Sequence, residues 1–312
     1  MPFPPETASK PSRRAGRSPT AGDRELIPQL NPAMACDTAF RVIGAHYLAG
    51  LSANHDPTCN GNPEGLHRMR VALTHLRTAI LFFSPMVADD ERTKIRHELK
   101  WLNARLGAVR DIDVAIERLA KANEAPCHAI LDHRAWNAKA ADAHQHLAQV
   151  LRSARYHRLI KNTSDWIENG RWSIDGGKRA KQRAVPVTEY GACKLARWQK
   201  KLLKKSRKLR KMSPEKRHRL RLLNKKLTYS IGFFADLFGD KKLSRVQRGL
   251  KHLRKAQRSL GQLNDDANAR SVAEELKTDG AHAAVHFLKP KRKKRLLRRA
   301  AASYRKLAKL KT

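Results

Sequence analysis

Two similar phrases, about half a chain apart, each place histidine, arginine or lysine on one side of an expected helix. The residues fall at i, i+3, i+7 and i+10, which is the spacing of a single helical stripe. The stripes are His67, Arg70, Thr74 and Arg77 in the first copy, and His218, Arg221, Lys225 and Thr228 in the second. Arginine can donate two hydrogen bonds to neighbouring phosphate oxygens, and lysine adds a compact charge. Histidine adds a donor whose protonation can follow binding of an anion. The pattern therefore predicts recognition of phosphate groups.

Each cationic stripe runs beside an apolar stripe that predicts a buried helix face. In the first copy the apolar residues are Met69, Leu73, Leu76, Ile80 and Phe83. The second copy also ends in a pair of aromatic residues, and Phe233-Phe234 corresponds to Phe82-Phe83. A repeat of this length indicates an internal duplication, and a duplication predicts an architecture of two similar halves.

A second phrase repeats as Leu106-Gly107 with Asp111, and as Leu260-Gly261 with Asp265. We expect helices over 89–106 and 108–121 in the first half, and over 243–261 and 265–276 in the second. Cations flank the apolar residues of these helices, and the candidates for binding are Lys100, Lys251 and Arg254. The acidic pairs Asp111-x-Asp113 and Asp265-Asp266 are interpreted as first-turn residues that complement a helix dipole. For any single lysine or arginine, a solvated surface position is the alternative.

The composition favours a polyanionic partner. The 312 residues carry 66 Lys and Arg against 28 Asp and Glu, a formal net charge of +38. Such self-repulsion is typical of proteins that bind nucleic acid, an acidic membrane surface or a phosphate polymer. Aromatic residues make up only 6%, which weakens a base-stacking mechanism.

The chain is expected to be all-α, with two pseudo-symmetric helical bundles around a basic central groove or pore. Residues 1–35 are rich in Pro, Ser, Arg and Gly and predict a disordered basic tail. The folded part, 36–312, divides into a first helical half (36–168), a connector (169–186) and a second helical half (187–312). No apolar stretch approaches the ~20 residues of a membrane-spanning helix, so no membrane insertion is expected. Four scattered cysteines without a CxxC pair favour reduced thiols and a cytoplasmic location.

These phrases resemble the CHAD family of helical domains named for their histidines. The resemblance covers roughly 36–310. It is carried by His67-x-x-Arg70-Val71 and Leu106-Gly107 with Arg110-Asp111, and by His218-x-x-Arg221 and Leu260-Gly261 with Asn264-Asp265. Trp166-Ile167 and Gly170-Arg171-Trp172 are similar to the family's mid-chain segment.

The resemblance implies binding of inorganic polyphosphate without catalysis, and an association with polyphosphate granules. It adds Lys226 to the binding positions, and assigns a binding role to His67, Arg70, Arg77, His218, Arg221 and Lys225. Thr74-His75 and Thr228 depart from the family pattern, because they stand where basic residues are usual. These departures predict a weaker or re-shaped groove.

Two alternatives remain open at this point. The basic runs 200–211 and 289–309 suit a nucleic-acid backbone, although we find no zinc finger, RNP phrase or helix-turn-helix pattern. A phosphate-transfer enzyme that uses a histidine or a metal is the second alternative, suggested by 14 histidines including His144-x-His146. Residues two apart do not face one another on a helix, and no Walker loop is present, so we expect neither an enzyme, a metal site nor a cofactor.

Overall fold

The computed structural model describes residues 28–123, 133–237, 240–278 and 288–310, and within these ranges the chain is all-helical. Most of the predicted tail therefore lies outside the described residues. The α-helices are α2 (Cys36–Ala53), α3 (His55–Cys59), α4 (Pro63–Phe82), α5 (Asp90–Asn123), α6 (His133–Arg152), α7 (Ala154–Asn169), α8 (Gly177–Ala184), α9 (Val187–Ser206), α10 (Pro214–Phe233), α11 (Asp240–Thr278) and α12 (Pro290–Lys309). Three short 3₁₀ turns connect them: η1 (Arg171–Ser173), η2 (Leu209–Lys211) and η3 (Ala235–Leu237).

The two helices that carry the repeated phrase begin in the same way. Ser213 caps α10 by accepting a hydrogen bond from the backbone N–H of Lys216, with Pro214 in the first turn. Asn62 caps α4 by accepting from the backbone N–H groups of Glu64 and Gly65, with Pro63 in the first turn. A polar cap followed by proline satisfies free N–H groups and fixes φ for helix entry.

The predicted helix breaks at Gly107 and just after Gly261 are wrong, because α5 and α11 each run without interruption through these positions. A glycine ends a helix mainly by adopting a positive φ, and neither glycine does so. Inside a helix it costs only about 1 kcal/mol relative to alanine. The apolar pattern continues across the first glycine through the buried residues Leu106, Val109 and Ile112, so packing keeps the helix intact.

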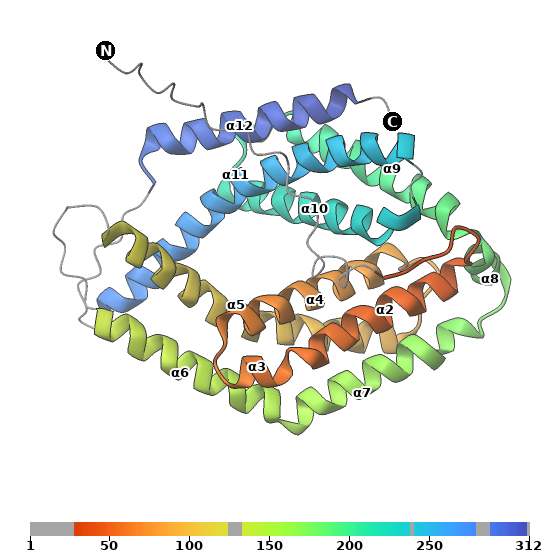
Figure 1. Ribbon diagram of the computed structural model, residues 1–312, viewed down its shortest axis with the longest axis horizontal. Helices are drawn as coiled ribbons and strands as arrows, with labels where there is room; N and C mark the ends of the chain where they lie inside the picture. Colours follow the sequence, from red (N-terminus) through yellow and green to blue (C-terminus); the bar gives the residue numbers. More distant parts are fainter. Residues whose placement is uncertain (1–27, 124–132, 238–239, 279–287, 311–312) are drawn as a thin grey trace, which may run out of the picture.

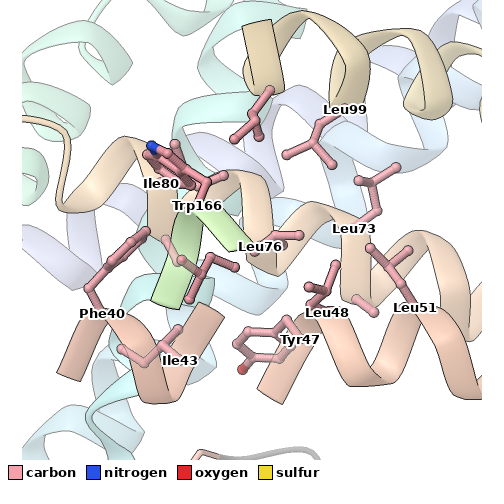
Figure 2. Packing of buried hydrophobic residues seen from close by; sticks show 14 of the residues in the cluster. Phe40, Ile43, Tyr47, Leu48, Leu51, Leu73, Leu76, Ile80, Leu99 and Trp166 are labelled. Carbon is pink, nitrogen blue, oxygen red and sulfur yellow. The ribbon is translucent and has the colours of Figure 1, made fainter. Parts of the chain in front are cut away.

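Buried apolar side chains form two clusters. The larger cluster packs α2 against α4, α5 and α7; Figure 2 shows Phe40, Ile43 and Tyr47 facing residues of α4, with Trp166 close by. The smaller cluster packs α9, α10, α11 and α12 around Leu227, Leu253 and Tyr304. The apolar stripe predicted for the first repeat is confirmed as core, since Met69, Leu73, Leu76, Ile80 and Phe83 are all buried.

The helices with the repeated phrases meet at the centre of the molecule. α4 packs against α10, and α5 packs against α11. In Figure 1, α9, α11 and α12 lie on one side of the α4–α10 pair, and α2, α3, α6 and α7 lie on the other. α12 contacts α9 and η2 as well as α11, so two basic segments far apart in the sequence lie together.

The predicted connector, 169–186, contains η1 and α8 and is bound to the first half. The Asp89 carboxylate accepts hydrogen bonds from the Trp166 indole N–H at 2.9 Å and from the backbone N–H of Trp172 at 3.2 Å. Gly170 has no room for a side chain, because a Cβ would lie 2.5 Å from the Trp166 carbonyl oxygen. At its end the connector pairs with the start of α2, where the backbone N–H of Cys36 donates to the carbonyl of Val185 at 3.1 Å.

Candidate functional site

The two cationic stripes face a shared region where α4 packs on α10. Arg70 and Arg77 of α4 are half-buried, as are Arg221, Lys225 and Lys226 of α10. His67 and His218 lie one turn nearer the start of each helix and are exposed. The apolar stripes of both helices point into the cores and hold the helices in place. The cations are left at the boundary between the two clusters.

Lys225 shows how closely these charges are gathered. Burial, together with the charges of Arg221, Arg70 and Arg77, lowers the pKa of the Lys225 ammonium to about 8. Two of these arginines come from α4 and one from α10, so the cations of both helices act on one another. The Lys225 ammonium also lies over the Tyr229 ring, 5.4 Å from its centre. We call Arg70, Arg77, Arg221, Lys225 and Lys226 the central cations.

The set extends toward both ends of α4. Burial lowers the pKa of His67, and the charge of Arg110 on α5 is the next largest cause. At the other end, burial lowers the pKa of Lys226, with further lowering by Arg77, Arg96 and Lys201. Arg96 also lowers the pKa of Arg77. Helix α5 therefore places Arg110 beside the His67 end of the row and Arg96 beyond its Arg77 end.

Carboxylates lie near the central cations without neutralising them. Burial raises the pKa of the Asp111 carboxyl against the opposing charge of Arg70, and nearby Asp265 raises it again. Asp111 accepts a hydrogen bond from the Asn268 amide of α11 at 3.0 Å, which links α5 to α11. Among the described residues, no carboxylate lies within 4.0 Å of a central cation, and the buried Nε of Arg221 has no hydrogen-bond partner. Arg110 differs, because it pairs with Glu117 at 2.9 Å.

The positions that depart from the family pattern are bound to their own helices. The Thr74 hydroxyl donates to the carbonyl of Arg70, and the Thr228 hydroxyl donates to the carbonyl of Asn224. His75 donates from Nδ1 to the carbonyl of Val71, and burial lowers its pKa to about 4. Its ring stacks on Tyr47 at 4.5 Å and lies 4.0 Å from Tyr229. His75 is therefore a neutral packing residue and adds no cation to the site.

The remaining predicted residues lie away from these contacts or on the surface. His218 donates from Nδ1 to the Asn264 side-chain oxygen at 2.6 Å, which leaves its other ring nitrogen for a ligand. Lys100 on α5 is exposed, as are Lys251 and Arg254 on α11. A binding role for these three stays a prediction.

The acidic and histidine motifs that suggested an enzyme have structural partners. The interpretation of Asp111 and Asp266 as first-turn residues is wrong, since both lie inside long helices. Asp266 accepts from the backbone N–H of Leu288 at 2.6 Å and pairs with Lys293, which fixes the lead into α12. His144 of α6 lies 2.9 Å from Asp113 of α5. Over the described ranges, no three His, Cys, Asp or Glu side chains cluster as metal ligands would.

Arg92 and Arg96 were not among the predicted site residues, although they lie with Lys100 at i, i+4 and i+8 on α5. This spacing is a helical stripe and was a usable signal. Arg92 donates to the Ser84 carbonyl at 2.7 Å, next to a cavity at the junction of α4 and α5. Which way such a stripe faces depends on how α5 packs against α4, and one sequence does not give that packing.

Comparison with known proteins identifies the class. The CHAD domain family model matches residues 43–274, so the chain belongs to the CHAD domain family. The crystal structure of the CHAD domain from the plant Ricinus communis is similar, with a TM-score of 0.72 at 24% sequence identity. The match covers 95% of this chain and 98% of that one, and it supports the all-helical fold. No curated protein matches the sequence. Among the helices described, none is both long and apolar enough to cross a membrane.

Proposed function

We propose that this protein binds inorganic polyphosphate, without catalysis, in a basic groove between two helical halves. The observation that carries the proposal is the group of central cations, which come from both α4 and α10 and have no carboxylate within salt-bridge distance among the described residues. Holding such charges together in a partly buried place is unfavourable, since burial and then the charges of Arg221, Arg70 and Arg77 lower the pKa of Lys225. A bound polyanion offsets that repulsion.

We infer that the two halves arose by internal duplication. The repeated phrases fall on α4 and α10 and on α5 and α11, and each helix packs against its counterpart. The smaller cluster lies within the second half, whereas the larger cluster also includes Val187, Phe233 and Phe234 of that half. The starts of α2 and α9 are joined by the pairing of Ala35 with Pro186. Counterparts that meet at the centre bring both cationic stripes to one groove.

Recognition in this proposal depends on charge and spacing. Arg70 and Arg221 donate to neighbouring phosphate oxygens, and Lys225 and Lys226 supply point charges between them. His67 and His218 extend the row at the exposed end. Thr74, His75 and Thr228 add no charge, so the groove is less cationic at these points than the family pattern implies. No step forms or breaks a covalent bond.

The test is titration with long-chain polyphosphate of the wild type and a quadruple variant in which His67, Arg70, His218 and Arg221 are changed to Ala. We expect the affinity to fall by at least roughly a hundredfold, since hydrogen bonds to charged groups contribute about 1.5–3 kcal/mol each and the two arginines alone account for about 3 kcal/mol or more. The control is Arg298→Ala with Arg305→Ala, which removes two arginines from exposed positions on α12. A folded quadruple variant that binds like the wild type would exclude the proposed site. Phosphate release in the presence of Mg²⁺ or Mn²⁺ would contradict the absence of catalysis.

Nucleic-acid binding is a second candidate, favoured by one observation. The basic runs 200–211 and 289–309 lie together because α12 packs against α9 and η2, and neither run contains an acidic residue. An exposed surface of this kind attracts any phosphate backbone. Competition between polyphosphate and RNA at matched salt separates the two candidates. We also propose that the protein is cytoplasmic and associates with polyphosphate granules.

A further inference from the structure

A cavity of about 330 Å³ lies where the end of α4 meets the start of α5. Ile80, Leu81 and Pro85 form an apolar wall, and Ser84, Arg92 and Arg96 contribute the polar lining. Arg92 is held by its hydrogen bond to the Ser84 carbonyl, so its guanidinium is fixed at the cavity rather than extended into solvent. The position differs from that of the central cations, which lie where α4 crosses α10.

Neither arginine of this cavity forms a salt bridge among the described residues. Asp89 is the acidic residue beside Arg92, but its carboxylate already accepts from Trp166, from the backbone of Trp172 and from the backbone N–H of Arg92. Within the described ranges, no carboxylate lies within 4.0 Å of Arg92 or Arg96. The Arg92 Nε is buried and has no hydrogen-bond partner there. A buried, unpaired donor of this kind is unfavourable unless an acceptor from a ligand reaches it.

The cavity continues the row of central cations. Arg77 lies one turn before Ile80, and the charge of Arg96 acts on both Arg77 and Lys226. At about 1.5 Å of rise per residue, Phe82 at the end of α4, two residues before Ser84, lies roughly 18 Å from Arg70. An anion at the cavity and an anion at Arg70 are therefore too far apart for a short phosphate ligand to reach both.

We propose that the cavity lined by Ser84, Arg92 and Arg96 is a second phosphate subsite, which takes the distal part of a chain that also occupies the central groove. This inference rests on the proposed function and adds chain-length selectivity to it. A long chain engages both subsites, and the second contact is then intramolecular and raises the overall affinity. A short phosphate occupies the central cations alone and gains nothing from the cavity.

The experiment compares tripolyphosphate with long-chain polyphosphate on Arg92→Gln combined with Arg96→Gln. We expect the affinity for long chains to fall roughly tenfold or more, because the second, intramolecular contact is lost. The affinity for tripolyphosphate should stay within about twofold. Arg158→Gln combined with Arg207→Gln is the matched control, since it removes two exposed arginines elsewhere. This control variant should lower both affinities only by the small amount expected from removing two positive charges anywhere on the protein.

Two outcomes overturn the inference: unchanged long-chain affinity, or equal weakening for short and long chains. Arg96→Gln alone is the second variant if loss of the Arg92 hydrogen bond unfolds the protein, because Arg96 is exposed. Arg96→Gln should also weaken binding of long chains but not of tripolyphosphate, by a smaller factor than the double variant. The proposed function fails in a different way, when the quadruple variant of the central groove keeps its affinity for both ligands.

Discussion

At the scale of single residues, Lys225 is the most informative position, because its pKa of about 8 places its titration near physiological pH. An exposed lysine titrates near pH 10.4 and stays charged under such conditions. A bound polyanion favours the charged form, so binding raises the pKa of Lys225. Binding above pH 8 therefore requires uptake of a proton, and affinity declines as pH rises.

The first prediction concerns this pH dependence. Between pH 7 and pH 9 we expect the affinity for polyphosphate to weaken by on the order of tenfold, as one pKa unit corresponds to a tenfold change. Lys225→Arg should flatten most of this decline, because arginine stays protonated. Measurement of the dissociation constant at several pH values checks the expectation.

Lys204→Arg is the control for this experiment, since Lys204 is exposed on α9. It should keep the decline seen in the wild type. If Lys225→Arg loses affinity as steeply as the wild type, the ammonium of Lys225 does not contact the ligand.

At the scale of helices, His75 joins three elements. It belongs to α4, stacks on Tyr47 of α2, and lies against Tyr229 of α10. Its pKa of about 4 lies below the ordinary value of 6.5, so the folded protein binds fewer protons there than the unfolded chain between these two values. Stability from this group is complete above about pH 6.5 and is lost as pH falls toward 4.

The corresponding prediction is a loss of about 2 kcal/mol of unfolding free energy between pH 7 and pH 5 from this one group. His75→Phe keeps an aromatic ring in the stack and should lose correspondingly less stability over the same interval. Chemical denaturation at both pH values measures the difference. The exposed His97, changed to Gln, is the control and should leave the pH dependence as it is in the wild type. Equal acid sensitivity in His75→Phe and the wild type would contradict a neutral, buried His75.

The same scale shows what sequence could and could not predict. The entry into α10 and the buried stripe of α4 follow from local rules, since caps, proline and apolar spacing act within a turn or two. The continuity of α5 and α11 does not, because tertiary packing outweighs the small cost of Gly107 and Gly261. The roles of Arg96 and Arg110 were missed for a related reason. They depend on how α5 packs against α4, and packing between two helices does not follow from rules that act within a turn or two.

At the scale of the whole molecule, the question is whether the groove or the general charge of +38 dominates binding. Both attract polyanions, but they differ in which residues neutralise phosphate charges and so release counterions from the polyanion. For a flexible polyanion, log affinity falls with log salt concentration with a slope of about −0.7 for each charge that the protein neutralises. The arginines of the groove therefore contribute a defined part of that slope.

The quadruple variant removes two arginines, Arg70 and Arg221, from the groove. We expect its salt slope to be shallower than that of the wild type by roughly 1.4, since each arginine accounts for about 0.7. If binding occurs on the outer surface formed by α9 and α12, the salt slope of the quadruple variant stays equal to that of the wild type. The slope of the α12 control variant, with Arg298 and Arg305 changed to Ala, then becomes shallower. For RNA, the slope should become shallower in the α12 control variant, even if for polyphosphate it becomes shallower in the quadruple variant. The packing of α4 against α10 fixes the spacing of the central cations, whereas the outer surface offers charge alone.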